Sequence, residues 1–329
     1  MAAQLGAEVV VVDRDGLGGS AVLTDCVPSK TLVATAEVMT LAAESGELGV
    51  RLSGEHDPVS AASTVGVDLA AVNDRVKRLA LAQSLDVATR LSAEGVRLIE
   101  GSGRLVERTS VEVAGERIDA DAVLVATGAS PRIVPGAEPD GERILTWTQV
   151  YDLKTCPERL IVVGSGVTGA EFASAYLALG SQVVLVSSRD RVLPGEDPDA
   201  AEVLEGVLQR RGMDVMGRSR AESVKRAGDS VVVTLTDGRT VEGSHCLMAV
   251  GSVPNTAGLG LEAAGVRLDD RGFVETDRVS RTSVGGVYAA GDCTGVLMLA
   301  SVAAMQGRIA MRHLLGDAVT PLDLKTVSS

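Results

Sequence analysis

A glycine-rich turn directly after an apolar run is the feature that most limits what this chain can fold into. The run, residues 160–163, contains only Leu, Ile and Val and predicts a buried strand, and it is followed at once by Gly164, Gly166 and Gly169. A helix is expected next, and a second apolar run at residues 183–186 completes a βαβ unit of about thirty residues. In this setting Gly164 permits a tight turn, Gly166 lets the backbone approach a pyrophosphate, and Gly169 lets the helix pack on the strand. The pattern predicts a dinucleotide site at the N-terminus of the helix.

The residues after the second strand of this unit indicate which dinucleotide is bound. Units that bind NAD usually place Asp or Glu there for the ribose 2′-hydroxyl, whereas this sequence has Ser187, Ser188 and Arg189. No carboxylate would repel a 2′-phosphate, and the guanidinium of Arg189 would attract it. We therefore expect NADPH to be accepted, with NADH as a second cofactor, although Arg189 also fits a solvated surface position.

The rest of the chain alternates short apolar runs with helical stretches, which is typical of an α/β fold with parallel strands covered on both faces. At 329 residues the chain exceeds the size at which one core keeps growing, so two domains are expected. Further strands are predicted at residues 9–12, 96–99, 111–113, 123–126, 231–235, 246–250 and 287–290. Further helices are predicted at residues 29–47, 70–94, 200–211 and 299–315. Pro, Gly and acidic residues at 135–142 predict a linker.

Composition excludes several classes of function. A net charge of −13 would repel phosphodiester backbones, so nucleic acid is not an expected partner. No stretch reaches the roughly eighteen apolar residues of a membrane-spanning helix, and Met1 does not open a secretion signal. The four cysteines are widely scattered and form no CxxC pair, which excludes a disulfide scaffold and a structural metal site. These features predict a cytoplasmic enzyme without a bound metal.

Five motifs follow one another along nearly the whole chain. They are Gly18-Gly19 with Cys26-Val27-Pro28-Ser29-Lys30, then Ala126-Thr127-Gly128, the glycine turn with Glu171, Val250-Gly251-Ser252-Val253-Pro254-Asn255-Thr256, and Tyr288-Ala289-Ala290-Gly291-Asp292. In this order they resemble the flavoprotein (pyridine nucleotide) disulfide reductase family, which includes lipoamide dehydrogenase, glutathione reductase and mercuric reductase. The resemblance implies two Rossmann-like domains that bind FAD and NAD(P), with the NAD(P) domain at residues 151–280 inserted between the FAD segments 1–150 and 281–329. Hydride then passes from NAD(P)H to the flavin.

The resemblance also implies roles for individual residues. Asp13 matches the acidic residue that binds the FAD ribose, and Asp292 matches the residue that bonds the ribityl chain. Lys30 matches the catalytic lysine beside flavin N5, and Glu171 the glutamate that pairs with it, although Lys30 also fits a surface lysine. Other cofactor contacts are implied at Gly19, Ser20, Gly103, Thr127, Gly128, Val224, Gly251 and Ala300, in addition to Gly164, Gly166, Gly169 and Arg189.

The main departure from the family concerns its redox disulfide. The family places a CxxxxC pair ahead of Pro-Ser-Lys, but here Ala21 stands at the first cysteine and only Cys26 remains. A thiol-disulfide relay needs a second cysteine to resolve the mixed disulfide, so reduction of lipoamide or glutathione should fail or be very slow. Cys26 then tunes the flavin, acts as a single-cysteine redox centre, or serves only as a small packing residue.

Without a dithiol, electrons would pass directly from the reduced flavin to a small acceptor, for which a quinone is the first candidate. The sequence resembles the actinobacterial NAD(P)H quinone reductases of this family, which also lack the first cysteine; residues 141–147 and 303–308 support this likeness. Ser252 and Ser301 replace the usual Arg and His and indicate a modified flavin environment. Alternative functions are a pyridine nucleotide transhydrogenase, a single-cysteine disulfide or peroxide reductase, and a non-catalytic dinucleotide-binding or redox-sensing protein.

Two parts of the family pattern are not found in the sequence. The first strand and glycine turn for FAD should precede Asp13 by about twenty residues, and a C-terminal interface domain should follow the last helix. We therefore expect a truncated member of the family, and a homodimer for the full-length family but not clearly for this chain.

Overall fold

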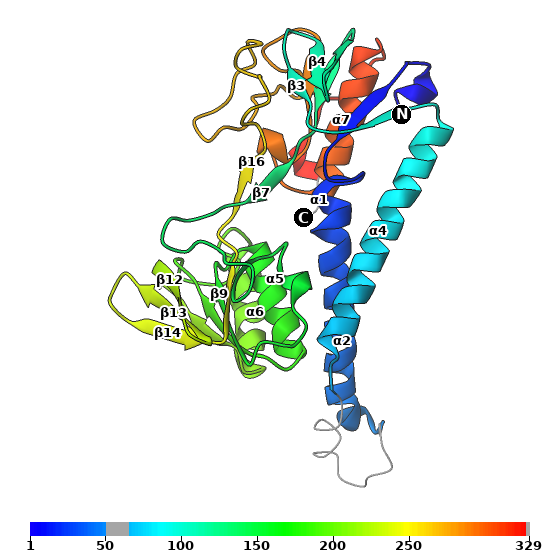
Figure 1. Ribbon diagram of the computed structural model, residues 1–329. Coiled ribbons are helices and arrows are strands. Elements are labelled where there is room, and N and C mark those ends of the chain that lie inside the picture. Colours follow the sequence, from blue (N-terminus) through cyan, green and yellow to red (C-terminus); the bar gives the residue numbers. More distant parts are fainter. Residues whose placement is uncertain (51–65, 327–329) are drawn as a thin grey trace. The chain divides into compact units, whose positions relative to one another are not determined.

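The computed structural model describes residues 1–50 and 66–326, which form two compact units (Figure 1). Unit 1 contains Met1–Cys26, Leu81–Ser130 and Ser252–Ser329, and unit 2 contains Val27–Ala80 and Pro131–Gly251. Among the described residues no helix is both long enough and apolar enough to cross a membrane. The predicted division into FAD and NAD(P) domains at residues 150 and 280 stays a prediction.

Unit 2 is built on a parallel sheet with the strand order β11-β10-β9-β15-β8. The five strands are β8 (Ile144–Thr146), β9 (Arg159–Val163), β10 (Gln182–Val186), β11 (Asp214–Met216) and β15 (His245–Met248). Its helices are α2 (Cys26–Glu44), the first half of α4 (Leu69–Ala93), α5 (Val167–Ala178) and α6 (Pro198–Arg210). An antiparallel meander of β12 (Ala221–Ala227), β13 (Ser230–Leu235) and β14 (Thr240–Gly243) completes the unit.

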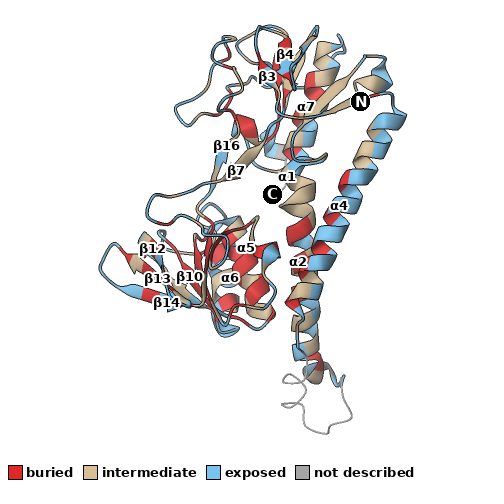
Figure 2. Cartoon of the chain, viewed as in Figure 1, coloured by how far each residue is buried: buried red, intermediate tan, exposed pale blue. Residues whose placement is uncertain are grey.

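Alternating side chains of β9 explain why this sheet is covered on both faces. Leu160 and Val162 pack in one apolar cluster with residues of α5, such as Phe172. Ile161 and Val163 pack in a second cluster with residues of the meander. Because successive side chains of a strand point to opposite faces, a strand buried on both sides reads as a continuous apolar run. The central strands are accordingly buried in Figure 2.

Unit 1 contains shorter sheets. Two are parallel pairs, of β1 (Val10–Asp13) with β2 (Arg97–Glu100), and of β6 (Val123–Val125) with β17 (Val287–Ala289). Antiparallel strands are β3 (Arg104–Leu105), β4 (Ser110–Val113) and β5 (Glu116–Asp119), and a two-stranded sheet joins β7 (Ala129–Pro131) to β16 (Ser252–Pro254). Its helices are α1 (Gly19–Leu23), the second half of α4, and α7 (Ala300–Leu314). Short 3-10 turns in the chain are η1 (Ala3–Leu5), η2 (Ser45–Leu48), η3 (Val150–Asp152), η4 (Asp292–Thr294) and η5 (Leu324–Thr326).

The structure confirms the α/β fold class and the predicted βαβ unit around the glycine turn, with one correction to the strands. The sequence runs at 111–113 and 231–235 lie in antiparallel sheets, as parts of β4 and β13, and not in a parallel sheet. Each run is flanked by more polar partner strands, such as β14, in which only every second residue is buried. An apolar run alone therefore did not distinguish the two kinds of sheet.

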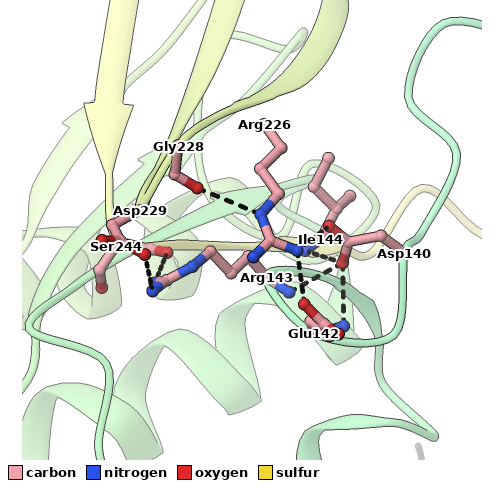
Figure 3. Close-up of polar contacts among 8 residues, drawn as sticks. All are labelled: Asp140, Glu142, Arg143, Ile144, Arg226, Gly228, Asp229 and Ser244. Atoms are coloured by element: carbon pink, nitrogen blue, oxygen red, sulfur yellow. Dashed lines mark hydrogen bonds and ion pairs between the residues drawn. The ribbon is translucent and has the colours of Figure 1, made fainter.

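A polar network connects the predicted linker with the meander of unit 2 (Figure 3). The carboxylate of Asp140 accepts hydrogen bonds from the backbone N–H groups of Glu142, Arg143 and Ile144 at 2.9, 2.8 and 2.8 Å. The guanidinium of Arg226 on β12 lies 3.7 Å from this carboxylate and 2.5 Å from that of Glu142. Burial acts to raise the pKa of Asp140, but the three N–H groups and Arg226 together hold it below its ordinary value. Asp140 thus fixes the start of β8.

We expect Asp140→Ala to lower the free energy of unfolding by about 1–2 kcal/mol, because three backbone donors lose their acceptor. The matched control Glu142→Gln removes only an exposed ion pair and should change stability by less than about 0.5 kcal/mol. Urea denaturation followed by circular dichroism measures both. Because the folded pKa of Asp140 is depressed, its contribution is present above the ordinary aspartate pKa and shrinks as the pH falls below it. Equal losses in the two variants would contradict this role.

Candidate functional site

The glycine turn of unit 2 lies between β9 and α5, and its three glycines meet different surroundings. A Cβ on Gly164 would overlap the carbonyl oxygen of Ala249, and a Cβ on Gly169 would overlap the carbonyl oxygen of Gly164. A Cβ on Gly166 would meet no atom within 4 Å. Gly164 and Gly169 are therefore required by packing, whereas Gly166 borders open space at the N-terminus of α5. Backbone N–H groups and the dipole of that helix end suit an anion such as a pyrophosphate.

Lys30 and Glu171 lie together in unit 2, although 141 residues separate them in the sequence. The Lys30 ammonium donates to both carboxylate oxygens of Glu171, at 2.8 and 2.9 Å. The side chain of Lys30, on α2, is 65% exposed, whereas that of Glu171, on α5, is only 19% exposed. In this pair a part-buried acceptor therefore holds an accessible cation. Its catalytic role stays a prediction.

Ser187, which stands where NAD-binding units usually have a carboxylate, is fully buried at the end of β10. Its hydroxyl lies 2.6 Å from the hydroxyl of Ser165 in the glycine turn and accepts the N–H of Arg189 at 3.1 Å. The carbonyl of Arg189 accepts from the N–H of Arg218, a residue with φ of +53°. Hydrogen bonds thus hold both the N–H and the carbonyl of Arg189, although Arg189 is an exposed residue. This arrangement leaves Arg189, and not Ser187, available to a ligand.

In unit 1 the predicted FAD residues lie at the ends of strands. One carboxylate oxygen of Asp13, the last residue of β1, accepts the N–H groups of Asp15 and Gly16 at 2.9 and 2.8 Å. After β6, the Thr127 hydroxyl donates to the carbonyl of Asn255 at 2.7 Å, and the Asn255 amide donates back to the Thr127 carbonyl at 3.0 Å. Gly128 follows with φ of +70° and open space at its Cβ position. Both hydrogen bonds to Asp13 go to its Oδ1 atom, and its role in binding FAD stays a prediction.

Asp292 begins η4 after Gly291 and has an unusual carboxylate. Among the described residues no side chain or backbone group donates a hydrogen bond to it. Burial and the nearby charge of Asp25 raise the pKa of Asp292 above its ordinary value. A half-buried carboxylate without a donor fits a ligand that brings hydroxyl groups.

The remaining predicted residues are dispersed over both units. Gly19 and Ser20 form the start of α1, and Ala300 begins α7. Gly103 packs against Val12 and Val111, and Gly251 has φ of +93° with open space at its Cβ position. Val224 lies in β12, where its side chain is 3% exposed in the core and its N–H donates to the carbonyl of Gly136. These roles stay predictions.

Cys26 is the first residue of α2 and Ala21 lies in α1. All four cysteines of the chain lie in its described part, and none forms a disulfide. Burial raises the pKa of Cys156, Cys246 and Cys293 above the ordinary value of a thiol. Those three residues are therefore not suited to act as thiolates.

Sequence reasoning did not single out Gln306 or Ser165. Gln306 on α7 is 1% exposed and bonds the backbone of Gly291, and Ser165 is 5% exposed and bonds Ser187. Gln306 was noted only within the subgroup motif 303–308, and Ser165 only as a variable position of the glycine turn. Only the fold brings them to their partners.

We expect Gly169→Ala to destabilise unit 2 by about 1–3 kcal/mol or more, because its Cβ has no space beside the carbonyl of Gly164. Gly166→Ala is the matched control, since φ of −70° and open space accept an alanine, and its stability should change by less than about 1 kcal/mol. Thermal unfolding without added nucleotide compares the two. Similar losses would show that the turn is not packed as described.

Three comparisons with known proteins agree with this geometry. Residues 1–307 match the family model described as pyridine nucleotide-disulphide oxidoreductase. The chain is 53% identical over 334 residues to an NAD(P)H dehydrogenase (quinone) of Mycobacterium tuberculosis, with 98% of this chain and 66% of that protein covered. It is 34% identical over 330 residues to a dihydrolipoyl dehydrogenase of Chlorobaculum parvum, covering 98% of this chain and 68% of that protein.

Among solved structures, the crystal structure of LpdA from Mycobacterium tuberculosis superimposes with a TM-score of 0.91 at 52% identity and covers 100% of this chain and 72% of that one. The chain thus spans slightly less than two thirds, 66%, of the length of its quinone-named relative. On the match of its family model, this chain belongs to the pyridine nucleotide-disulphide oxidoreductase family.

Proposed function

We propose that this chain is an FAD-dependent oxidoreductase that takes hydride from NAD(P)H and delivers electrons to a quinone. Membership of the family and likeness to NAD(P)H dehydrogenases imply FAD and NAD(P)H as cofactors. The observation that carries the proposal is the glycine turn, with open space at Gly166 and the Lys30–Glu171 pair on the helices of the same unit. We propose a quinone as the electron acceptor because the relative in Mycobacterium tuberculosis is named NAD(P)H dehydrogenase (quinone).

The residues present in unit 2 fit a nicotinamide nucleotide. Gly166 supplies the close backbone approach that a pyrophosphate needs, and α5 supplies its N-terminus. Arg189 is exposed after the end of β10, and Ser187 takes the position where NAD-binding units usually have a carboxylate. We propose that NADPH binds there in preference to NADH.

The residues present in unit 1 fit FAD. Asp13 has one carboxylate oxygen committed to its own turn and the other available to ribose hydroxyls. Asp292 lacks a donor among the described residues, which the ribityl hydroxyls would supply. Gly128, with open space at its Cβ position, would allow backbone contact with the cofactor.

The Lys30–Glu171 pair would act in the hydride step. When bound, FAD accepts a hydride from reduced nicotinamide and gives two electrons to an acceptor. We propose that the Lys30 ammonium stabilises the negative charge that arrives with the hydride, while the two hydrogen bonds to Glu171 hold that ammonium in a fixed orientation. A pre-oriented cation costs no reorganisation when charge develops, which makes it an effective catalytic group.

The choice of a quinone as the electron acceptor is based on the cysteines of the chain. Ala21 in α1 removes the partner that Cys26 would need, and none of the four thiols is in a disulfide. A quinone accepts electrons without thiol exchange, so it suits a chain with one cysteine at this position. We further propose a cytoplasmic location, because thiols that form no disulfide suit a reducing compartment. The family resemblance implies a homodimer for the full-length members of the family.

We expect NADPH to bleach the flavin absorbance of the FAD-loaded protein when the two are mixed in a stopped-flow instrument, and a menadione-type quinone to restore it. Cys26→Ser should keep quinone reduction, because the proposed electron route does not use the thiol. A protein that stays yellow with NADPH would refute the oxidoreductase. Loss of quinone turnover in Cys26→Ser alone would refute the direct route and favour a single-cysteine reductase.

We expect Arg189→Leu to weaken NADPH binding by about tenfold and to leave NADH binding nearly unchanged, because only NADPH offers a phosphate to the guanidinium. Arg210→Leu, at another exposed arginine of unit 2 at the end of α6, is the matched control and should affect neither nucleotide. Dissociation constants from fluorescence titration give the ratio. An unchanged NADPH:NADH ratio in Arg189→Leu would assign Arg189 to the solvated surface.

A further inference from the structure

A buried glutamine in unit 1 makes hydrogen bonds that the proposed chemistry does not explain by itself. Gln306 lies in α7 and is only 1% exposed, which is rare for a polar side chain unless both ends of its amide are bonded. Its carbonyl oxygen accepts the N–H of Gly291 at 2.8 Å, and its NH₂ group donates to the hydroxyl of Thr294 at 3.3 Å. Both partners belong to the segment that follows β17.

Thr294 completes a closed set of hydrogen bonds. Its hydroxyl donates to the carbonyl of Gly291 at 2.7 Å while it accepts from Gln306. Gly291 therefore has its N–H and its carbonyl engaged, one by the glutamine and one by the threonine. Gly291 has φ of +81°, which a residue with a side chain rarely adopts. The three bonds fix the backbone of Gly291, directly before Asp292, and join it to the side chain of Thr294, two residues after Asp292.

The side chain of Asp292 contrasts with this fully bonded frame. Its carboxylate receives no hydrogen bond from the described residues. The nearby charge of Asp25 also acts to raise the pKa of Asp292. Burial of a carboxylate without donors is unfavourable, so a rigid frame is needed to hold it in place until a ligand supplies hydroxyl groups. A backbone free to rotate would turn the carboxylate toward water.

We propose that Gln306 and Thr294 are positioning residues that hold Asp292 for the hydroxyl groups of the FAD ribityl chain. The inference rests on the proposed function, because it takes FAD as the ligand of unit 1. An amide suits this position because it accepts and donates at the same time, which a leucine or an ionised glutamate does not do. Neither residue contacts the cofactor in this proposal; both act through Asp292.

The test compares FAD retention by purified wild type and four variants of the whole chain between about pH 5.5 and pH 8, a range in which a glutamate with a raised pKa titrates. The fluorescence of FAD changes when it binds, so a titration gives the dissociation constant without any turnover. Gln306→Glu and Thr294→Val break the set of bonds, and Thr294→Ser preserves the hydroxyl. Ile309→Val is the matched control, because it removes one methylene from a buried position of the same helix.

We expect Thr294→Val to weaken FAD binding by about tenfold at every pH, and Thr294→Ser to restore it. Gln306→Glu should hold FAD at the acidic end, where a neutral carboxylic acid donates and accepts as the amide does. It should release FAD as the pH rises, because an ionised glutamate cannot donate to Thr294. Ile309→Val should lower thermal stability and leave FAD binding unchanged, since it lies outside the frame.

The titratable groups near this position determine the direction of the pH effect. They are Asp292 and Cys293 in η4, Asp25 before α2, Tyr288 in β17 and His313 in α7. The two carboxylates and burial disfavour a further negative charge, so the glutamate of the variant would ionise well above the ordinary value. Wild type measured over the same range corrects for the titration of Asp292 itself.

The possible outcomes separate the two proposals. Wild type that binds no FAD would overturn the proposed function and this inference with it. Wild type that binds FAD, together with Thr294→Val and Gln306→Glu variants that bind it equally well at all pH values, would overturn only the inference. Equal weakening in Ile309→Val would show a general loss of packing in α7 and would also overturn it.

Discussion

The arrangement of unit 2 depends on two places where backbone meets backbone without room for a Cβ. Gly164 lies against the carbonyl of Ala249, beyond the end of β15, and Gly169 lies against the carbonyl of Gly164. These contacts bring α5 close to the carboxyl edge of the parallel sheet, where ligands of such sheets bind. Glu171 follows two residues after Gly169 on the same helix, so the close approach also determines where the acceptor for Lys30 lies. One packing constraint therefore produces both the turn and the ion pair.

The bonding of polar groups distinguishes scaffold from ligand site. Asp140 is saturated by three backbone N–H groups, and the Ser187 hydroxyl is engaged by Ser165 and by the N–H of Arg189. Such groups stabilise a loop and have little capacity left for a ligand. Asp292 shows the opposite pattern, since its backbone is fixed while its carboxylate receives no donor from the described residues. A rigid frame around an unsatisfied group is the expected structure of a preformed site.

The sequence predicts those features that depend on local order. The strands and turn around Gly164 are predictable because a strand buried on both faces must be apolar throughout and a tight turn must contain glycine. The meander strands β12 and β14 are not predictable, because β12 buries only Val224 and β14 buries only every second residue, so neither has a continuous apolar run. Gln306 is missed for a different reason, since its partner Gly291 lies fifteen residues away and only the packing of α7 brings the two together. Long-range hydrogen bonds leave no periodic signal in a sequence.

Cys26, the one cysteine in the motif where the family has a pair, bears on the choice of electron acceptor. The family is described by its pyridine nucleotide and its disulphide, yet Ala21 removes one sulfur while the glycine turn and the Lys30–Glu171 pair are both present. In the proposed function, the glycine turn and the Lys30–Glu171 pair serve the entry of a hydride, which does not require a thiol. A second sulfur would be needed only for the exit of electrons by thiol-disulfide exchange. Under the proposed function the chain therefore needs an acceptor that takes electrons without covalent attachment, and a quinone meets that requirement.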